Sequence, residues 1–228
     1  MDVRVEQERS AGVARSIVDF AVTGGMDLIV MCTHGRSGLR HLLAGSNAQQ
    51  IVASGRIPVL QVRPRVSANS GLECRRLLVP LDSNAEHEAA LDMAGALASA
   101  CGSDIHLLVV VPTLRTLRGE RAAAARLAPA ATAAILEMSR DGAEAYLNRL
   151  LARLQGEGVQ VSGEIQRDDP ARAIERTAKR IHADLIVLGT HRKTGADAFW
   201  AGSVASKVSN RSRLPVLLIP LESQPTGI

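Results

Sequence analysis

Aromatic residues are scarce in this sequence of 228 residues, where they make up 2% of the chain. Proteins that bind single-stranded nucleic acid need aromatic rings beside basic residues, because bases stack on those rings. Lys and Arg outnumber Asp and Glu by only 27 to 23, and this mild excess is not concentrated in one segment. The composition therefore predicts a protein that does not bind nucleic acid.

Long apolar runs are missing as well. The longest uninterrupted stretches, Leu28–Cys32 and Leu107–Val111, each have five residues, whereas a membrane-spanning helix needs about 20. The N-terminal segment, residues 1–9, is charged and has no apolar region of the kind that a secretory signal requires. These absences predict a cytoplasmic protein with no membrane partner.

Cysteine is also rare, and the three residues Cys32, Cys74 and Cys101 are odd in number and far apart. Such spacing forms neither a disulfide framework nor a zinc site, so we expect reduced thiols and no bound metal. Cys32 ends an apolar run and is interpreted as a small core residue. A redox-sensing thiol is the alternative for this position.

The sequence does contain an internal repeat. Residues 14–62 align without gaps on residues 171–219 at a constant offset of 157, and 19 of the 49 pairs are identical. The second copy is preceded by a long segment, beginning near residue 73, that the first copy lacks. Two modules of unequal length are therefore predicted. The predicted boundaries are a partial module at 1–66, a linker at 67–72, a complete module at 73–222 and a tail at 223–228.

The partial module begins at what corresponds to its third strand, Val3–Glu6. A sheet that lacks its central strands is exposed, so this half module is not expected to fold well alone. Either the start of the module lies upstream, or the fragment completes itself by packing on the second module or on a partner chain.

Strands alternate with helices five times in the complete module. This pattern is typical of an α/β fold with a doubly wound, parallel, five-stranded sheet and helices on both faces. The chain then consists of one complete module plus a C-terminal half module. Apolar runs predict strands at 75–82, 104–112, 159–165, 183–189 and 214–220. Helices are predicted at 86–100, at about 133–154 and at 203–210, and Asp169-Pro170 starts a further helix with a cap and a first-turn proline.

Ligands of parallel α/β sheets bind beyond the carboxyl ends of the strands. In the complete module, strands end in Pro80-Leu81-Asp82, in Val110-Val111-Pro112 and in Leu188-Gly189-Thr190-His191. Gly202-Ser203 then begins a helix, where free N–H groups and the positive end of the helix dipole suit a phosphate. The alternative role for Ser203 is that of a simple helix cap.

The segment after the fourth strand carries the motif G-x2-G-x9-G-[ST] in a modified form. It follows ADLIVLGTH at residues 183–191 and precedes PVLLIP at residues 215–220. DDPARAI at 168–174 and AGSVA at 201–205 match in order and spacing. On these residues the chain resembles the universal stress protein family, as a tandem member whose first module is truncated.

The resemblance implies a non-catalytic stress-response protein that binds an adenine nucleotide, ATP or AMP, in its second module. It places Asp82, at the end of the Pro80-Leu81 strand, and Val110 near the adenine. Leu188 and Gly189 would lie near the ribose. The residues implied for the phosphates are Gly202, Ser203 and Val204, with Arg192 at the position of the middle motif glycine. Arg192 would either obstruct the phosphates or pair with them.

The resemblance also implies association through the last strand of each module. The segments PVLQV (58–62) and PVLLI (215–219) are then expected to pair, either in a homodimer or within one chain as a pseudo-dimer. In the first copy the leading motif glycine is Cys32, and the strand that would supply the aspartate is absent. A complete nucleotide pocket cannot form within that module. An interaction module that binds no nucleotide is the alternative function.

Other candidates are weaker. His34 and His191 occupy equivalent loop positions but have no nucleophile or carboxylate pair at a fitting offset for acid–base catalysis. The pair Asp168-Asp169 is interpreted as a helix start rather than a metal site. The stretch Leu114–Leu127 is interpreted as a flap over the site, with a membrane-surface helix as the alternative. A phosphoryl-transfer enzyme is disfavoured because no general base or magnesium-ligand set is visible.

Overall fold

The computed structural model describes residues 12–32, 46–63, 73–82, 88–111, 113, 123, 126–191 and 203–221. The second half of the sequence forms the five strands that its apolar runs predict. These are β3 (Arg76–Leu81), β4 (Asp104–Val111), β5 (Val161–Arg167), β6 (Leu185–His191) and β7 (Val216–Leu221). They are hydrogen-bonded in the order β7-β6-β3-β4-β5, and every neighbouring pair is parallel. The predicted doubly wound sheet is confirmed.

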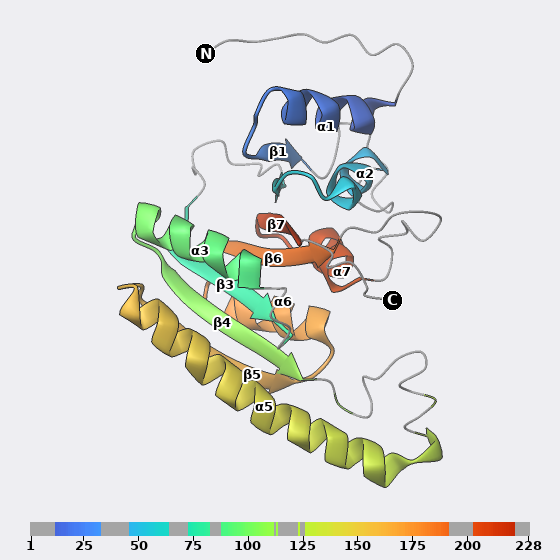
Figure 1. The fold of residues 1–228 in the computed structure, drawn as a ribbon, viewed down its shortest axis with the longest axis vertical. Coiled ribbons are helices and arrows are strands. Elements are labelled where there is room, and N and C mark those ends of the chain that lie inside the picture. Colours follow the sequence, from blue (N-terminus) through green and yellow to red (C-terminus); the bar gives the residue numbers. More distant parts are fainter. Residues whose placement is uncertain are drawn as a thin grey trace, which may run out of the picture.

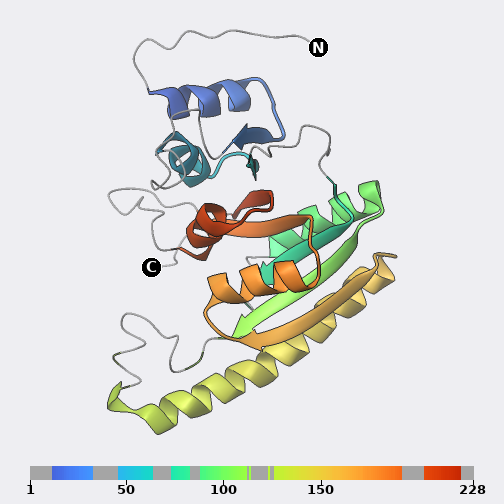
Figure 2. The same ribbon diagram turned by 180° about the vertical axis from the view of Figure 1, so that it is seen from behind.

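Helices connect these strands and cover both faces of the sheet (Figures 1 and 2). They are α3 (Glu88–Cys101), α5 (Pro129–Gly156), α6 (Pro170–Arg180) and α7 (Val204–Arg211). One of them, α5, begins earlier than predicted, at Pro129 rather than near residue 133. Proline is tolerated in the first helical turn, where its missing N–H has no partner in any case.

Two helix starts match their sequence signals. Asp169 caps α6, and its Oδ1 accepts a hydrogen bond from the Arg172 backbone N–H over 3.3 Å. Ser203 caps α7, and its Oγ accepts a hydrogen bond from the Ser206 backbone N–H over 3.1 Å. Both caps satisfy a donor that the first turn of a helix otherwise leaves unpaired.

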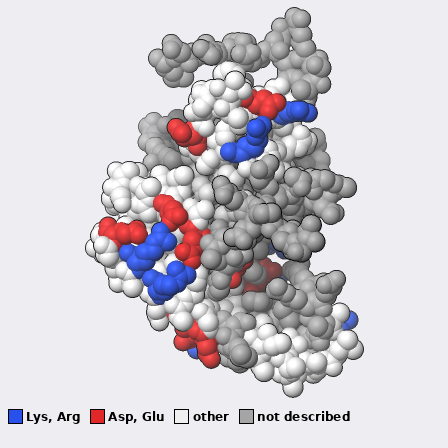
Figure 3. Space-filling view, in the orientation of Figure 1, with Lys and Arg blue, Asp and Glu red and all other residues white. Residues whose placement is uncertain are grey.

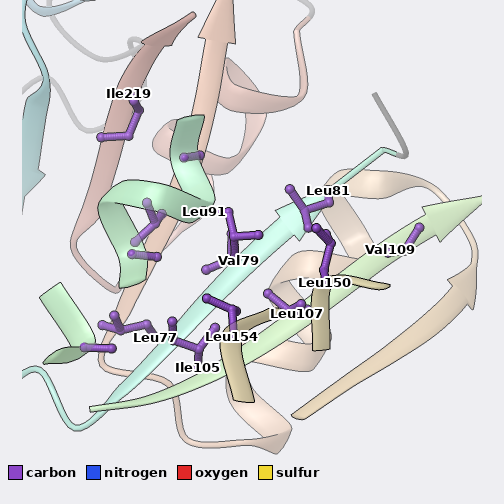
Figure 4. Close-up of a cluster of buried hydrophobic side chains, with 14 of the residues drawn as sticks. Leu77, Val79, Leu81, Leu91, Ile105, Leu107, Val109, Leu150, Leu154 and Ile219 are labelled. Atoms are coloured by element: carbon purple, nitrogen blue, oxygen red, sulfur yellow. The ribbon is translucent and has the colours of Figure 1, made fainter. Parts of the chain in front are cut away.

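Apolar side chains form a core on each face of the sheet. On one face, Leu77, Val79 and Leu107 pack against Leu91 of α3 and Leu150 of α5 (Figure 4). The other face is covered by α6 and α7 together with two helices of the N-terminal half. Both faces of β3 and β4 are therefore buried, as expected for continuous apolar strands in a parallel sheet.

The N-terminal half repeats the end of the complete module. It consists of α1 (Val13–Thr23), β1 (Ile29–Cys32), α2 (Ser46–Ser54) and β2 (Val59–Val62). The bounds of α1, shifted by the repeat offset of 157, are those of α6. The predicted strand at Val3–Glu6 and the linker at 67–72 lie outside the described residues.

The two halves share one sheet, because β2 pairs with β7. The pairing is antiparallel and places Leu60 opposite Leu217, its counterpart in the repeat. The complete order is β1-β2-β7-β6-β3-β4-β5. The expected pairing of the two PVL segments within one chain is thus confirmed, and since β7 has a neighbour on each side it has no free edge for a second copy.

The interpretation of Cys32 as a core residue is wrong, because its side chain is exposed. It lies on β1, which is an edge strand whose residues alternate between partly buried and exposed. Only one face of β1 packs on α1 and α2, so an apolar run here did not mean burial on both faces. No helix among the described residues is long and apolar enough to cross a membrane.

Candidate functional site

The candidate site lies where β3 and β6 meet, because the chain leaves these neighbouring strands in opposite directions along the sheet. Their parallel register joins Leu77 to Leu185 and Leu78 to Ile186. In contrast, the register of β3 with β4 runs over six residue pairs to Leu81. The carboxyl ends of β3 and β6 thus extend past their paired segment, at the place where open α/β sheets bind ligands.

Pro80 gives a physical reason why this pairing stops. The Arg75 carbonyl accepts a hydrogen bond from the Asp104 N–H on the β4 side, and the Arg76 carbonyl accepts one from the Asp184 N–H on the β6 side. Backbone groups alternate between the two sides along a strand, so the backbone groups of Pro80 point toward β6. Because proline has no N–H, the ladder between β3 and β6 loses a donor there.

Asp82 and Val110 come together at the ends of β3 and β4. The register pairs Pro80 with Leu108 and Leu81 with Val109, which places Asp82 beside Val110 one step further along. Pro80, Leu81 and Val110 are buried, whereas Asp82 is exposed. This end of the sheet therefore presents an accessible carboxylate above an apolar floor.

The end of β6 forms the second part of the candidate site. Leu188 is buried, Gly189 is half-buried and the Thr190 side chain is buried. In the parallel register with β7, Leu188 lies opposite Leu218. The absence of a Cβ at Gly189 leaves the backbone of this strand end accessible to a ligand.

The start of α7 is the third part. Ser203 has an extended backbone conformation and caps the helix, and Val204 begins it. The first turn of α7 holds no acidic residue, so the positive end of the helix dipole is not neutralised from within that turn. Arg192 and Gly202 lie outside the described residues.

Tyr146 of α5 is a further residue whose surroundings include a residue of this site, Asp82. Burial raises the pKa of its hydroxyl to about 12, and the negative charges of Glu88 and Asp82 contribute to this shift. The hydroxyl is buried and has no hydrogen-bond partner among the described residues. A tyrosine at helical core spacing gives no sequence signal that the carboxylates of Glu88 and Asp82 act on its hydroxyl.

Glu88 and Arg149 lie next to this tyrosine. The Arg149 Nη2 is 2.7 Å from the Glu88 Oε1, and the Arg149 guanidinium carbon lies 5.2 Å from the centroid of the Tyr146 ring. Figure 3 shows basic and acidic side chains side by side over α3 and α5. The flank of the site beside β3 thus carries carboxylates that are partly balanced by arginine.

The pair Asp168-Asp169 is engaged within the protein. The Asp168 Oδ1 accepts the Asp169 backbone N–H over 2.7 Å, and its Oδ2 lies 2.9 Å from the Arg176 Nη2. These contacts lower the pKa of Asp168, with the backbone hydrogen bond as the largest cause. The helix-start interpretation is confirmed. Among the described residues, no three His, Cys, Asp or Glu side chains gather in a way that would hold a metal ion.

The structure does not test His34 and His191 as candidates for acid–base catalysis. His191 ends β6, but its side chain lies outside the described residues, as does all of His34. The predicted flap at Leu114–Leu127 also lies largely outside them.

Comparison with known proteins identifies the family. The sequence profile of the universal stress protein family matches residues 2–63 and 73–220. This chain belongs to the universal stress protein family. The two matched segments correspond to the N-terminal half and the complete module of the structure.

Universal stress proteins from two organisms are similar to most or to part of this chain. The one from Mycolicibacterium smegmatis is 26% identical over 219 residues, which cover 92% of this chain and 67% of that relative. Universal stress protein MJ0531 from Methanocaldococcus jannaschii is 33% identical over 85 residues, covering 37% of this chain and 50% of the relative. This chain therefore spans between half and two thirds of these relatives.

Solved structures support the same fold. A universal stress protein from Archaeoglobus fulgidus matches with a TM-score of 0.63 and 21% identity, covering 90% of this chain and 66% of that chain. A universal stress protein in complex with cAMP matches with a TM-score of 0.50 and 20% identity, covering 65% of this chain and 98% of that chain.

Proposed function

We propose that this chain is a non-catalytic universal stress protein that binds an adenine nucleotide, ATP or AMP, at the carboxyl ends of β3, β4 and β6. The observation that supports the proposal is the topology. Asp82 and Gly189 lie toward the carboxyl ends of the neighbouring strands β3 and β6, α7 begins after β6, and the chain leaves these two strands in opposite directions along the sheet. Such a position is the general ligand site of open α/β sheets.

The charges around the site favour one orientation of the nucleotide. On the β3 side, Asp82 and Glu88 disfavour a phosphate but provide acceptors for the amino group of adenine or for ribose hydroxyls. On the α7 side, the helix start at Ser203 and Val204 favours negative charge. The base would therefore lie over β3 and β4, and the phosphates would lie toward α7.

Binding without turnover is proposed because the described site offers a single exposed carboxylate, Asp82, and a capping hydroxyl, Ser203. Phosphoryl transfer depends on a positioned nucleophile together with magnesium-binding side chains. The proposed output is a change in association with partners in the stress response, and a nucleotide complex of a universal stress protein is known from the structure with cAMP.

A second candidate function is that of an interaction module without nucleotide. The departures from the family motif favour it, since Cys32 and Arg192 stand where the motif has glycine. A side chain at a phosphate-contacting glycine prevents close approach of the backbone.

Calorimetric titration of the full chain with ATP, ADP, AMP and cAMP tests the proposal. We expect saturable binding of at least ATP or AMP with one site per chain. Asp82→Ala should weaken ATP and AMP by a similar factor, about tenfold, because a base-side hydrogen bond is common to both. Asp141→Ala, at an exposed position of α5, is the matched control and should leave binding unchanged. Absence of heat with all four nucleotides at millimolar concentration would exclude nucleotide binding and leave the interaction module.

The Arg192→Gly variant distinguishes the two roles that Arg192 could have, pairing with the phosphates or obstructing them. If the guanidinium pairs with the phosphates, the variant should bind ATP more weakly while AMP changes less. If the side chain obstructs the phosphates, the variant should bind ATP more tightly. An equal change for both nucleotides would show that Arg192 does not act through the terminal phosphates.

A further inference from the structure

A serine, a histidine and a glutamate lie side by side on β4 and β5. The parallel register places His106 of β4 opposite Ser162 of β5. Alternate residues of a strand share a face, so Glu164 lies on the same face of the sheet as Ser162. The His106 Nδ1 is 2.9 Å from the Ser162 Oγ, and the His106 Nε2 is 3.6 Å from the Glu164 Oε1. The imidazole ring thus lies between a hydroxyl and a carboxylate.

This cluster is separate from the proposed nucleotide site. His106 lies near the start of β4, whereas Val110 lies near its carboxyl end. The four residue steps between them span about 13 Å along the strand. The function proposed for the carboxyl ends of the strands therefore does not account for the cluster.

The Glu164 carboxylate is held in position by its own strand and by α6. Its Oε1 accepts hydrogen bonds from the Gln166 Nε2 over 2.9 Å and from the Thr177 Oγ1 over 3.2 Å. The Arg180 Nη2 donates to the same oxygen, and the Thr177 side chain is fully buried. This carboxylate oxygen is therefore fixed beside the imidazole ring.

The carboxylate selects the tautomer of His106. The Nε2 atom is buried, and at 3.6 Å the carboxylate acts on it through charge rather than through a hydrogen bond. A lone pair on Nε2 would be repelled by the negative oxygen, so the ring proton is favoured on Nε2. The Nδ1 atom then accepts the hydrogen bond of the Ser162 hydroxyl.

The ring of His106 is also kept neutral. Burial lowers the pKa of His106, and the positive charges of Arg180 and Arg76 add to this shift against the opposite effect of Glu164. A neutral imidazole at neutral pH is the form that can take a proton as a general base.

The Ser162 hydroxyl is accessible. Ser162 is exposed, and among the described residues β5 is hydrogen-bonded to β4 alone, at one edge of the sheet. The hydroxyls of Ser54 and Ser212, in contrast, donate to backbone carbonyls, which cannot take the proton. A hydroxyl that faces a basic nitrogen, which is itself oriented by a third group, is the arrangement of an activated nucleophile.

We propose that Ser162 is a modification site that takes up an acyl group from an activated ester, with His106 as its general base and Glu164 as a positioning residue. The Ser162 Oγ forms a bond to the ester carbonyl carbon while its proton passes to the His106 Nδ1. The bond from that carbon to the leaving oxygen then breaks, and the leaving alcohol takes the proton from Nδ1. The products are an acylated serine and an alcohol, so no oxidant or reductant takes part.

Incubation of the full chain with p-nitrophenyl acetate, without nucleotide, tests the proposal. We expect one acetyl group per chain on Ser162, located by peptide mass spectrometry, and one equivalent of released p-nitrophenol. The acetylation rate should follow the deprotonation of His106, with a midpoint below the ordinary pKa of 6.5. Acetylation of lysines would instead increase toward their own pKa near 10.

Three variants assign the roles. Ser162→Ala should remove the modification, and His106→Gln should slow it at least about 100-fold, because an amide cannot take the proton. Glu164→Gln should slow it less and move the midpoint of the pH profile to lower pH, because Glu164 raises the pKa of His106. A merely structural role of Glu164 would leave that midpoint unchanged. The matched control is Ser54→Ala, which removes a hydroxyl that donates to a carbonyl and should leave the rate unchanged.

Three results would overturn the proposal. The first is acetylation confined to lysines, with Ser162 unmodified. The second is an unchanged rate at Ser162 in a His106→Gln variant that keeps the circular dichroism spectrum of the original chain. The third is a rate at Ser162 that rises with pH without levelling off, because hydroxide rather than His106 would then take the proton.

Discussion

Tyr146 is the single tyrosine of the chain, so its ionisation can be followed directly. Burial is the main reason why the pKa of its hydroxyl is raised to about 12, and Glu88 is the largest charge that adds to the shift. Since the folded state holds this proton more tightly than the unfolded chain, the associated stability is complete below the unfolded pKa, near 10. It is lost as the pH rises through the folded pKa.

We therefore expect the ultraviolet absorbance of the phenolate to rise with a midpoint near pH 12 in the native protein, read soon after a rapid pH jump. In denaturant the midpoint should be near pH 10. Asp82→Asn should lower the native midpoint because it removes a negative charge near the hydroxyl. A native midpoint equal to the denatured one would contradict the burial of the Tyr146 hydroxyl.

Strand β2 has a neighbouring strand on each side, so a buried polar side chain on it is unusual. Gln61 is 2% exposed, and neither atom of its amide has a hydrogen-bond partner among the described residues. It lies opposite Val216 in the antiparallel register, so the two side chains share one face of the sheet. Its counterpart in the repeat is the fully buried Leu218.

We expect Gln61→Leu to raise the free energy of unfolding by about 1–3 kcal/mol, because it removes an unpaired buried amide without leaving a cavity. Urea denaturation monitored by circular dichroism measures the change. Gln61→Ala is the control, since it removes the same amide but leaves a void and should not stabilise the protein. A loss of stability in Gln61→Leu would show that the amide does have a partner.

An arginine side chain, in addition to the β2–β7 strand pairing, connects the two halves of the molecule. Arg63 follows β2, and its Nη2 donates hydrogen bonds to the backbone carbonyls of Ser209 and Asn210 at the end of α7. The carbonyl end of a helix attracts positive charge. This arginine therefore links the N-terminal half to the complete module across the β2–β7 boundary.

Arg63→Met keeps the aliphatic stem but removes these donors, and we expect it to lower the free energy of unfolding by about 1–3 kcal/mol. Hydrogen exchange should also increase in residues 46–62 more than in residues 88–111. The matched control is Arg211→Met, which removes the same charge from an exposed position in the last turn of α7. Equal effects of the two variants would mean that the Arg63 contacts contribute nothing beyond charge.

Much of the fold was predictable because local signals agreed with one another. The apolar runs at residues 104–112 and 183–189 overlap β4 and β6, and the Asp169-Pro170 signal marks the start of α6. These features depend on neighbouring residues, which can be read directly from a sequence. The meeting of the two PVL segments was instead implied by the resemblance to the universal stress protein family, and the strand pairing confirms it.

Burial in the N-terminal half was not predictable in this way. Cys32 and Val30 belong to an apolar run that is similar to the one in β6, yet both are exposed. Whether an apolar strand is buried depends on which helices and strands cover it, and the covering elements of β6 are distant in sequence. The same limit applies to Tyr146, whose helical spacing indicated a core position but not the nearby carboxylates.

Local pattern and internal similarity were enough for the α/β class, the unequal modules and the strand-end positions of Asp82 and Gly189, because hydrophobic spacing and caps act over a few residues. The three-dimensional arrangement was needed for the single seven-stranded sheet, the separation of β3 and β6 at Pro80 and the exposure of Val30 on the edge strand β1. These features arise from contacts between segments far apart in the chain. Such contacts depend on how the sheet edges and helix faces meet, which no local pattern encodes.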